Sequence, residues 1–145
     1  MIEIHNKNCI DFMRSMDSNI IDLTVTSPPY DNMRDYEGTL VWDFDIFKQV
    51  ANELYRITKH GGVVVWVVGD ETNDGTESLT SFRHALYFKE IGFKVNDTMI
   101  YNRNAMPNSA KRYSQDFEYM FVLSKGKVNT FNPIMIPCTY AGVGT

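Results

Sequence analysis

The sequence has few cysteines, no long apolar run and no excess of positive charge. Cys9 and Cys138 are too few for a disulfide scaffold and lack metal-ligand spacing, so a reduced, cytoplasmic setting fits best. No stretch approaches the roughly 20 apolar residues that a membrane helix needs, and the first residues show no signal-peptide pattern. These shortages predict a protein with no disulfide scaffold, no metal site and no membrane partner.

The charge balance argues against a generic polyanion binder. The formal net charge is −4 at pH 7, whereas contact with phosphate groups needs a basic surface. A net charge of −4 does not exclude a local basic patch. The 145 residues are 43% hydrophobic and 22% charged, which suits one folded domain with a sizeable core.

Apolar periodicity predicts alternating strands and helices. The predicted strands are Ile2–Ile4, Ile20–Thr26, Val63–Val68, Phe93–Tyr101 and Phe117–Leu123. One helix follows an Asn8 cap, a second carries Phe47 to Ile57 and ends at Gly61-Gly62 with Lys59 and His60 in its last turn, and a third is capped by Ser81. The continuous apolar run at 63–68 is typical of a strand buried on both faces. We expect an α/β fold: a partial doubly wound, mostly parallel sheet with an antiparallel C-terminal hairpin.

The segment Ser27-Pro28-Pro29-Tyr30 follows the second predicted strand, at the sheet edge where ligands bind in doubly wound folds. Pro29 restricts Pro28 to extended geometry, which fixes the direction of the Pro28 carbonyl. A hydroxyl beside a fixed carbonyl can accept two hydrogen bonds from one NH₂ group, and the Tyr30 ring can stack on the planar group that carries it. From these four residues alone, a rigid loop with a packed tyrosine is an equally good interpretation.

Thr26-Ser27-Pro28-Pro29-Tyr30 closely resembles the catalytic loop of the S-adenosylmethionine-dependent amino-methyltransferases. Further segments resemble the DNA-methylating members in the same order: Leu54–Gly62, Gly92-Phe93, Met99–Asn104, Met106-Pro107, Lys111–Tyr113 and Phe117–Tyr119. A catalytic loop near the N-terminus is similar to the circularly permuted beta group of these DNA methyltransferases. The resemblance covers roughly residues 1–133 and implies a Rossmann-like methyltransferase sheet.

One departure from that family concerns the cofactor. The Phe-x-Gly-x-Gly loop is absent, and Gly142-Val143-Gly144 is no substitute because no strand precedes it and no helix follows. The resemblance therefore implies that residues 1–145 are the N-terminal, catalytic-loop portion of a methyltransferase domain. The glycine loop for S-adenosylmethionine is expected beyond residue 145, and this portion alone is expected to be inactive.

The resemblance also implies roles for the four loop residues. Ser27 and the Pro28 carbonyl would accept the hydrogens of an exocyclic amine, Pro29 would hold that carbonyl, and Tyr30 would stack on the base. Such acceptors act most strongly on the transition state, where positive charge develops on nitrogen. A base inside a duplex cannot reach this loop, so the base must be flipped out of double-stranded DNA.

Two further groups of residues are candidates for binding. Asn8, Cys9 and Asp11 open the first helix, and the similar position in the family lies near the adenine of the cofactor. The alternative for these three is plain helix capping. Arg103, Lys111 and Arg112 are the best candidates for contact with DNA phosphates, and the alternative for them is a solvated loop.

Trp42 and Asp43 follow the catalytic motif along the chain. They either flank the flipped base or serve packing. Asp70 ends a predicted strand on the ligand side, but Gly-Asp is also common turn chemistry.

The first residue of the catalytic motif bears on which amine is methylated. Ser27 at the first motif position resembles the cytosine-N4 enzymes, so cytosine N4 is favoured over adenine N6. The alternatives are methylation of an RNA base or a protein amide, which the motif order disfavours, and a non-catalytic DNA-binding or regulatory module. A homodimer and a companion restriction endonuclease of a restriction-modification system are candidate partners, and the sequence itself identifies neither.

Overall fold

The computed structural model describes residues 1–29, 42–104 and 111–135. Within these ranges the helices and strands follow one another as α1 (Cys9–Arg14), β1 (Ile21–Thr26), α2 (Phe44–Ile57), β2 (Thr58–Val68), β3 (Thr72–Asn73), β4 (Thr76–Glu77), α3 (Thr80–Glu90), β5 (Lys94–Asn102) and β6 (Phe117–Ser124). The predicted alternation of helices with strands is therefore present from α1 to β6.

Four strands form one mixed sheet in the order β1-β2-β6-β5, and β3 and β4 form a separate two-stranded sheet. β1 and β2 pair in parallel, whereas β2–β6 and β5–β6 pair antiparallel. Strands β1, β2 and β5 consequently run in one direction and β6 runs in the other. The antiparallel C-terminal hairpin is confirmed, but only one of the three pairings in the large sheet is parallel.

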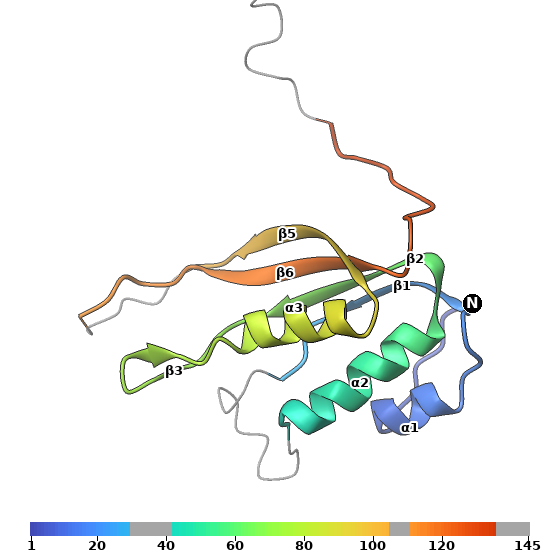
Figure 1. Ribbon diagram of the computed structural model, residues 1–145, viewed down its shortest axis with the longest axis horizontal. Coiled ribbons are helices and arrows are strands. Elements are labelled where there is room, and N and C mark those ends of the chain that lie inside the picture. Colours follow the sequence, from blue (N-terminus) through green and yellow to red (C-terminus); the bar gives the residue numbers. More distant parts are fainter. Residues whose placement is uncertain (30–41, 105–110, 136–145) are drawn as a thin grey trace, which may run out of the picture.

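The helices lie on one side of the large sheet (Figure 1). The apolar residues of α2, among them Phe47, Ala51 and Leu54, are buried with Val64 and Trp66 of β2. In α3, Phe88 is fully buried and its ring packs at 5.1 Å, edge to face, against Trp66. The core therefore sits between this layer of helices and one face of the sheet. A doubly wound arrangement needs helices on both faces, so it stays a prediction.

The predicted end of the second helix is wrong. α2 ends at Ile57, and Lys59, His60, Gly61 and Gly62 lie in β2. Thr58 adopts an extended backbone, and its hydroxyl donates a hydrogen bond of 2.6 Å to the carbonyl of Leu54. The extended backbone at Thr58, which pairs with Ile21 of β1, ends the helix before the glycines are reached. The positive φ of 82° at Gly61 then serves the start of the strand, where the Gly61 amide donates to the carbonyl of Lys125.

Two predictions for the other elements are also wrong. Ile2 and Ile4 are 92% and 93% exposed and form no strand, because alternation alone cannot hold a strand that has no neighbour. Ser81 is not the cap of α3: Leu79 occupies that position with a φ of 55°, and Ser81 lies in the first turn. The Asn8 cap is confirmed, since its Oδ1 accepts hydrogen bonds from the amides of Ile10 and Asp11.

None of the helices within the described ranges combines the length and the apolarity needed to cross a membrane. Those ranges also contain no group of three or more His, Cys, Asp or Glu side chains placed to hold a metal ion.

Candidate active site

Ser27, Pro28 and Pro29 follow directly on β1, at the edge of the sheet where the parallel strands β1 and β2 have their carboxyl ends. Thr26, the last residue of β1, pairs with Trp66 of β2. Pairing stops there because proline has no amide hydrogen to donate to a neighbouring strand. Ser27 is exposed and the two prolines are half-buried, so the segment turns out of the sheet at this edge.

A cavity of about 310 Å³ opens at this position, which we call the loop cavity. It is lined by Cys9, Met13, Thr24, Thr26, Ser27, Pro28, Pro29, Trp42, Val50, Leu54 and Trp66. Its walls come from α1, β1, α2, β2 and the segment before α2. Most of the lining side chains are apolar, with a few polar groups among them, which is the usual make-up of a site for a small organic ligand.

Helix α1 brings one of the predicted cofactor residues to the loop cavity. Cys9 lines it, whereas Asn8 caps the helix and Asp11 is exposed beside Arg14 at 3.7 Å. The position of α1 is fixed from α2, because the Arg56 guanidinium donates hydrogen bonds to the carbonyls of Met13 (2.6 Å) and Met16 (2.9 Å). Of the three residues predicted near the cofactor, only Cys9 is brought to the predicted catalytic residues.

The segment before α2 contributes a wall of the loop cavity. Trp42 is half-buried and lines it, together with the catalytic-loop residues. Asp43 instead caps α2, where its Oδ1 accepts a hydrogen bond of 2.8 Å from the amide of Ile46. Two alternative roles were predicted for both residues, flanking the base or packing. Only Trp42 lines the loop cavity, so only Trp42 lies where it could flank a base.

Asp70 has a structural role at the same edge of the sheet. Its carboxylate accepts hydrogen bonds from the Ser81 amide (2.8 Å) and the Ser81 hydroxyl (2.5 Å), and the side chain is 8% exposed. A carboxylate at a helix N-terminus satisfies unpaired amides there. The side chain that caps the start of α3 is therefore that of Asp70, and not that of Ser81 as predicted.

The basic residues predicted to contact DNA have different surroundings. Arg112 forms an ion pair of 2.8 Å with Glu77 of β4 and donates to the hydroxyl of Thr72 in β3. Arg103 lies 3.7 Å from the carboxylate of Glu118. Lys111 is exposed. Arg112 thus links its segment to the β3–β4 hairpin, and contact of these three residues with DNA stays a prediction.

Sequence reasoning missed several residues of the loop cavity, notably Thr24 and Trp66. Thr24 is two residues before Thr26, and period-2 alternation places both on one face of β1. Trp66 is reached only through the register of β1 with β2, which the sequence does not specify. Tyr30, the fourth predicted catalytic residue, lies outside the described residues.

Comparison with known proteins assigns this chain to one family. The sequence model of a family described as DNA methylase, the N6/N4 type, matches residues 21–142, and the chain belongs to this family. The orphan methyltransferase M.BamHII of Bacillus amyloliquefaciens is 59% identical over 113 residues, which are 77% of this chain and 41% of M.BamHII. The type II methyltransferase M.BglII of Bacillus subtilis is 26% identical over 148 residues, covering 96% of this chain and 40% of M.BglII.

Solved structures share the fold. The PvuII DNA methyltransferase, described as cytosine-N4-specific, superposes with a TM-score of 0.69 at 18% identity over 84% of this chain and 48% of its own. A DNA modification methylase of Thermus thermophilus, TTHA0409, solved with S-adenosyl-L-methionine, superposes with a TM-score of 0.63 at 21% identity over 87% of this chain and 55% of its own. The chain spans about 40% of the length of the two curated relatives and about half of these two structures.

Proposed function

We propose that this protein supplies the catalytic loop of a DNA methyltransferase that methylates an exocyclic amine of a flipped base, with S-adenosylmethionine as cofactor. The observation that carries the proposal is the loop cavity, where Ser27-Pro28-Pro29, directly after β1, and Cys9 of α1 line one space. The resemblance to the amino-methyltransferases implies that the Ser27 segment binds the reacting amine and that the Cys9 segment lies near the cofactor. A shared cavity gives methyl donor and acceptor one place to meet.

The residues present fit such ligands. The loop cavity of about 310 Å³ is at the lower end of the roughly 300–1,000 Å³ typical of small-molecule sites. Apolar side chains such as Met13, Val50 and Trp66 offer surface to a flat heterocycle, and Ser27 offers a hydroxyl. When bound, S-adenosylmethionine supplies an electrophilic methyl group.

The proposed chemistry of the chain is the handling of a poor nucleophile. The lone pair of an exocyclic amine is delocalised into the base ring. By accepting hydrogen bonds that the two amine N–H groups donate, the Ser27 hydroxyl oxygen and the Pro28 carbonyl raise the electron density on nitrogen and favour tetrahedral geometry. Pro29 holds the carbonyl in place, Tyr30 stacks on the base, and the fixed geometry supplies much of the rate enhancement.

Within this proposal cytosine N4 is the favoured target and adenine N6 the second. Ser27 at the first motif position supports cytosine, and the PvuII enzyme that shares the fold is described as cytosine-N4-specific. Double-stranded DNA is the proposed partner. Lys111 is the first candidate for contact with a phosphate, because it is exposed and the other two basic residues lie beside carboxylates. The cytoplasmic location, a homodimer and a companion restriction endonuclease stay predictions.

The test is a methyl-transfer assay on the protein as its gene encodes it. Protein, labelled S-adenosylmethionine and either duplex DNA or RNA are incubated, and mass spectrometry identifies the modified nucleoside. N4-methylcytosine in DNA is the expected product, and N6-methyladenine would move the target to adenine. Label confined to RNA or to protein amides would contradict the proposal. So would a folded protein that binds DNA and cofactor but transfers no methyl group, which is the behaviour of a non-catalytic module.

A further inference from the structure

Trp66 of β2 belongs both to the wall of the loop cavity and to the buried core. It lines the cavity beside Ser27, and it pairs with Thr26, the last residue of β1. Only 1% of the residue is exposed, so the packed side chains around the indole ring fix its position. Residues that hold this ring therefore act on the shape of the loop cavity.

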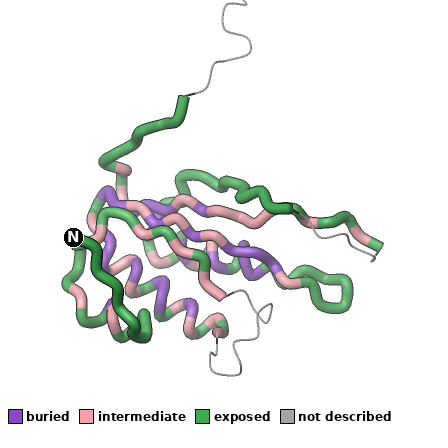
Figure 2. The backbone as a smooth tube through the Cα atoms, turned by 180° about the vertical axis from the view of Figure 1, so that it is seen from behind, coloured by how far each residue is buried: buried purple, intermediate pink, exposed green. Residues whose placement is uncertain are grey.

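Three rings from the helices surround the indole of Trp66. Phe47 of α2 lies at 5.7 Å, and His84 and Phe88 of α3 lie at 5.9 Å and 5.1 Å, each packed edge to face. Buried residues occur both in the strands and in the helices, as the purple stretches in Figure 2 show. The phenyl rings hold the indole by apolar contact, but they supply no nitrogen or oxygen acceptor for its N–H.

His84 supplies that acceptor. The Nε1–H of Trp66 donates a hydrogen bond of 3.3 Å to Nδ1 of His84, a residue that is 2% exposed. The imidazole is held in turn by stacking on Phe47, with 3.6 Å between the ring centroids and an angle of 12° between the planes. Because a buried indole N–H without an acceptor is costly, this bond fixes the direction of the polar edge of the indole.

The direction of this bond bears on what a ligand in the loop cavity meets. His84 lies in α3, and the described residues that line the loop cavity include none from α3. The N–H of Trp66 thus points to a helix outside the cavity. An apolar ring surface suits the flat face of a heterocycle, whereas a buried N–H facing the cavity would require an acceptor from the ligand.

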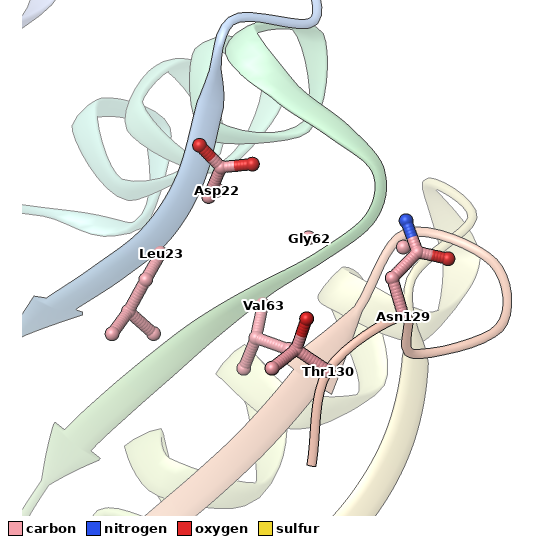
Figure 3. Close-up of a pocket in the computed structure, with 7 residues that line it drawn as sticks. Asp22, Leu23, Gly62, Val63, Asn129 and Thr130 are labelled. Carbon is pink, nitrogen blue, oxygen red and sulfur yellow. The ribbon is translucent and has the colours of Figure 1, made fainter.

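The second pocket beside β2 has no such link to His84. It has a volume of about 360 Å³ and lies at the amino ends of β1 and β2, where Figure 3 shows Leu23, Val63 and Thr130. Its lining residues among those described come from β1, β2 and the segment after β6, and none comes from α2 or α3. A change at His84 should consequently alter the loop cavity and leave the second pocket unchanged.

We infer that His84 is a positioning residue of the proposed methyl-transfer site. By accepting the hydrogen bond from Trp66, His84 directs the polar edge of the indole toward α3, and ring carbon borders the loop cavity. The inference rests on the proposed function, because it concerns the space in which a nucleobase or the adenine of S-adenosylmethionine is proposed to bind. Both present a flat heterocycle to the cavity wall.

The experiment compares two isosteric substitutions in the protein as its gene encodes it. His84→Asn offers an acceptor oxygen where Nδ1 lies, whereas His84→Leu places a methyl group there, and both remove the ring. The indole N–H signal of Trp66 is followed by proton–nitrogen NMR and assigned through its loss in Trp66→Phe. Adenosine and cytidine are titrated as separate probes. Thr130→Ala, in the second pocket, is the control.

We expect adenosine or cytidine to shift the Trp66 signal in the unaltered protein, in Thr130→Ala and, with similar affinity, in His84→Asn. His84→Leu should weaken this binding by about tenfold or more relative to His84→Asn, because the indole N–H has lost its acceptor. The Trp66 N–H should also exchange faster with solvent in His84→Leu. A purely structural role of the imidazole would affect both His84 variants alike, since both lack the ring.

Equal nucleoside binding by the two His84 variants would overturn the inference. So would a Trp66 signal that neither nucleoside shifts in the unaltered protein. If circular dichroism shows that the variants are unfolded, nitrogen NMR of the unaltered protein decides: an Nδ1 of His84 without a proton supports the inference, and a protonated Nδ1, which cannot accept, overturns it.

The nucleoside titrations contain no methyl donor, so the two proposals can fail separately. Nucleoside binding at Trp66 without methyl transfer in the assay described above would reject the proposed function alone. Methyl transfer by a protein whose Trp66 signal neither nucleoside shifts would reject the role of His84 alone.

Discussion

The two ends of the parallel pair β1–β2 carry cavities of similar size but opposite character. At the carboxyl end, the loop cavity of about 310 Å³ is lined by Ser27 and by apolar side chains from α1 and α2. At the amino end, the pocket of about 360 Å³ is bordered by Asp22, Gly61 and Asn129. The two cavities therefore do not differ in volume. They differ in whether the polar groups around them form hydrogen bonds and ion pairs within the chain.

Polar groups around the amino end hold the chain together. The Lys59 ammonium lies 2.8 Å from the carboxylate of Asp22, and the Asn129 amide group donates a hydrogen bond of 3.0 Å to the carbonyl of His60. Lys125 donates to the Asn19 side chain (2.8 Å) and to the carbonyl of Tyr55 (2.7 Å). Substitutions at the amino end should therefore change stability, whereas those at the carboxyl end should change activity.

The strongest change that we predict is a loss of activity at the carboxyl end. In the protein as its gene encodes it, Ser27→Ala removes a proposed acceptor of the amine hydrogens, and we expect methyl transfer to fall by about 100-fold or more, as when a transition-state hydrogen bond is lost. Thr130→Ala, at the amino-end pocket, should leave the rate unchanged. Rates with labelled cofactor, together with thermal melts of both variants, measure the contrast. Undiminished transfer by Ser27→Ala would end the proposed role of the loop.

The next effect is on stability at the amino end. At Gly61, with a φ of 82°, an added Cβ would collide with the Asn129 side chain, so Gly61→Ala combines backbone strain with the loss of a hydrogen bond. We expect a loss of about 2–3 kcal/mol in the free energy of unfolding. Gly75→Ala is the control, because its φ of 77° is similar but nothing lies within 4 Å. It should cost only about 1 kcal/mol. Urea denaturation of both variants measures the difference, and equal losses would show that the Asn129 contact adds nothing.

A smaller effect is expected for the basic residues near the carboxyl end. Lys111→Ala should lower the slope of log affinity for DNA against log salt concentration by about 1, because one phosphate contact is lost. Arg112→Ala should change that slope less, since Arg112 is bound to Glu77 and Thr72. Fluorescence anisotropy at several salt concentrations tests this order. A reversed order would assign the phosphate contact to Arg112.

The smallest effect is a pH dependence at Lys125. Burial lowers the pKa of Lys125 below its ordinary value of 10.5. Between the lowered pKa and 10.5 the unfolded chain binds more protons than the folded chain, so stability rises with pH across this window. Relative to Lys125→Met, the unaltered protein should therefore gain stability as pH rises toward 10.5. Urea denaturation of both proteins at several alkaline pH values measures the gain, and a constant difference would contradict it.

The elements that the sequence predicted well are those with strong local signals. Asn8 caps α1, the apolar face from Phe47 to Ile57 lies in α2, and the run at 63–68 lies in β2, all as predicted. The end of α2 was misplaced because Gly61-Gly62 is the more familiar stop signal. The actual stop is the extended backbone at Thr58, together with the pairing of Thr58 with Ile21 of β1.

The residues of the candidate site likewise fall into those with a local sequence signal and those without one. Ser27, Pro28 and Pro29 were found from their motif, and Cys9 from its place at the start of α1. The predicted grouping of Arg103, Lys111 and Arg112 was only partly informative, because acidic partners for two of them come from Glu118 and Glu77, outside the segment that carries them. Such pairs depend on how the hairpins fold back, and no local pattern encodes that.

The alternation of helices with strands and the proline corner at the end of β1 can be predicted from local sequence, because periodicity and proline chemistry act within a few residues. Three features are visible only in the folded chain: which side chains share the loop cavity, the hydrogen bonds by which Arg56 of α2 positions α1, and the placement of the described helices on one face of the sheet. These features depend on strand register and long-range packing, in which residues far apart in the chain satisfy one another's hydrogen bonds and apolar surface.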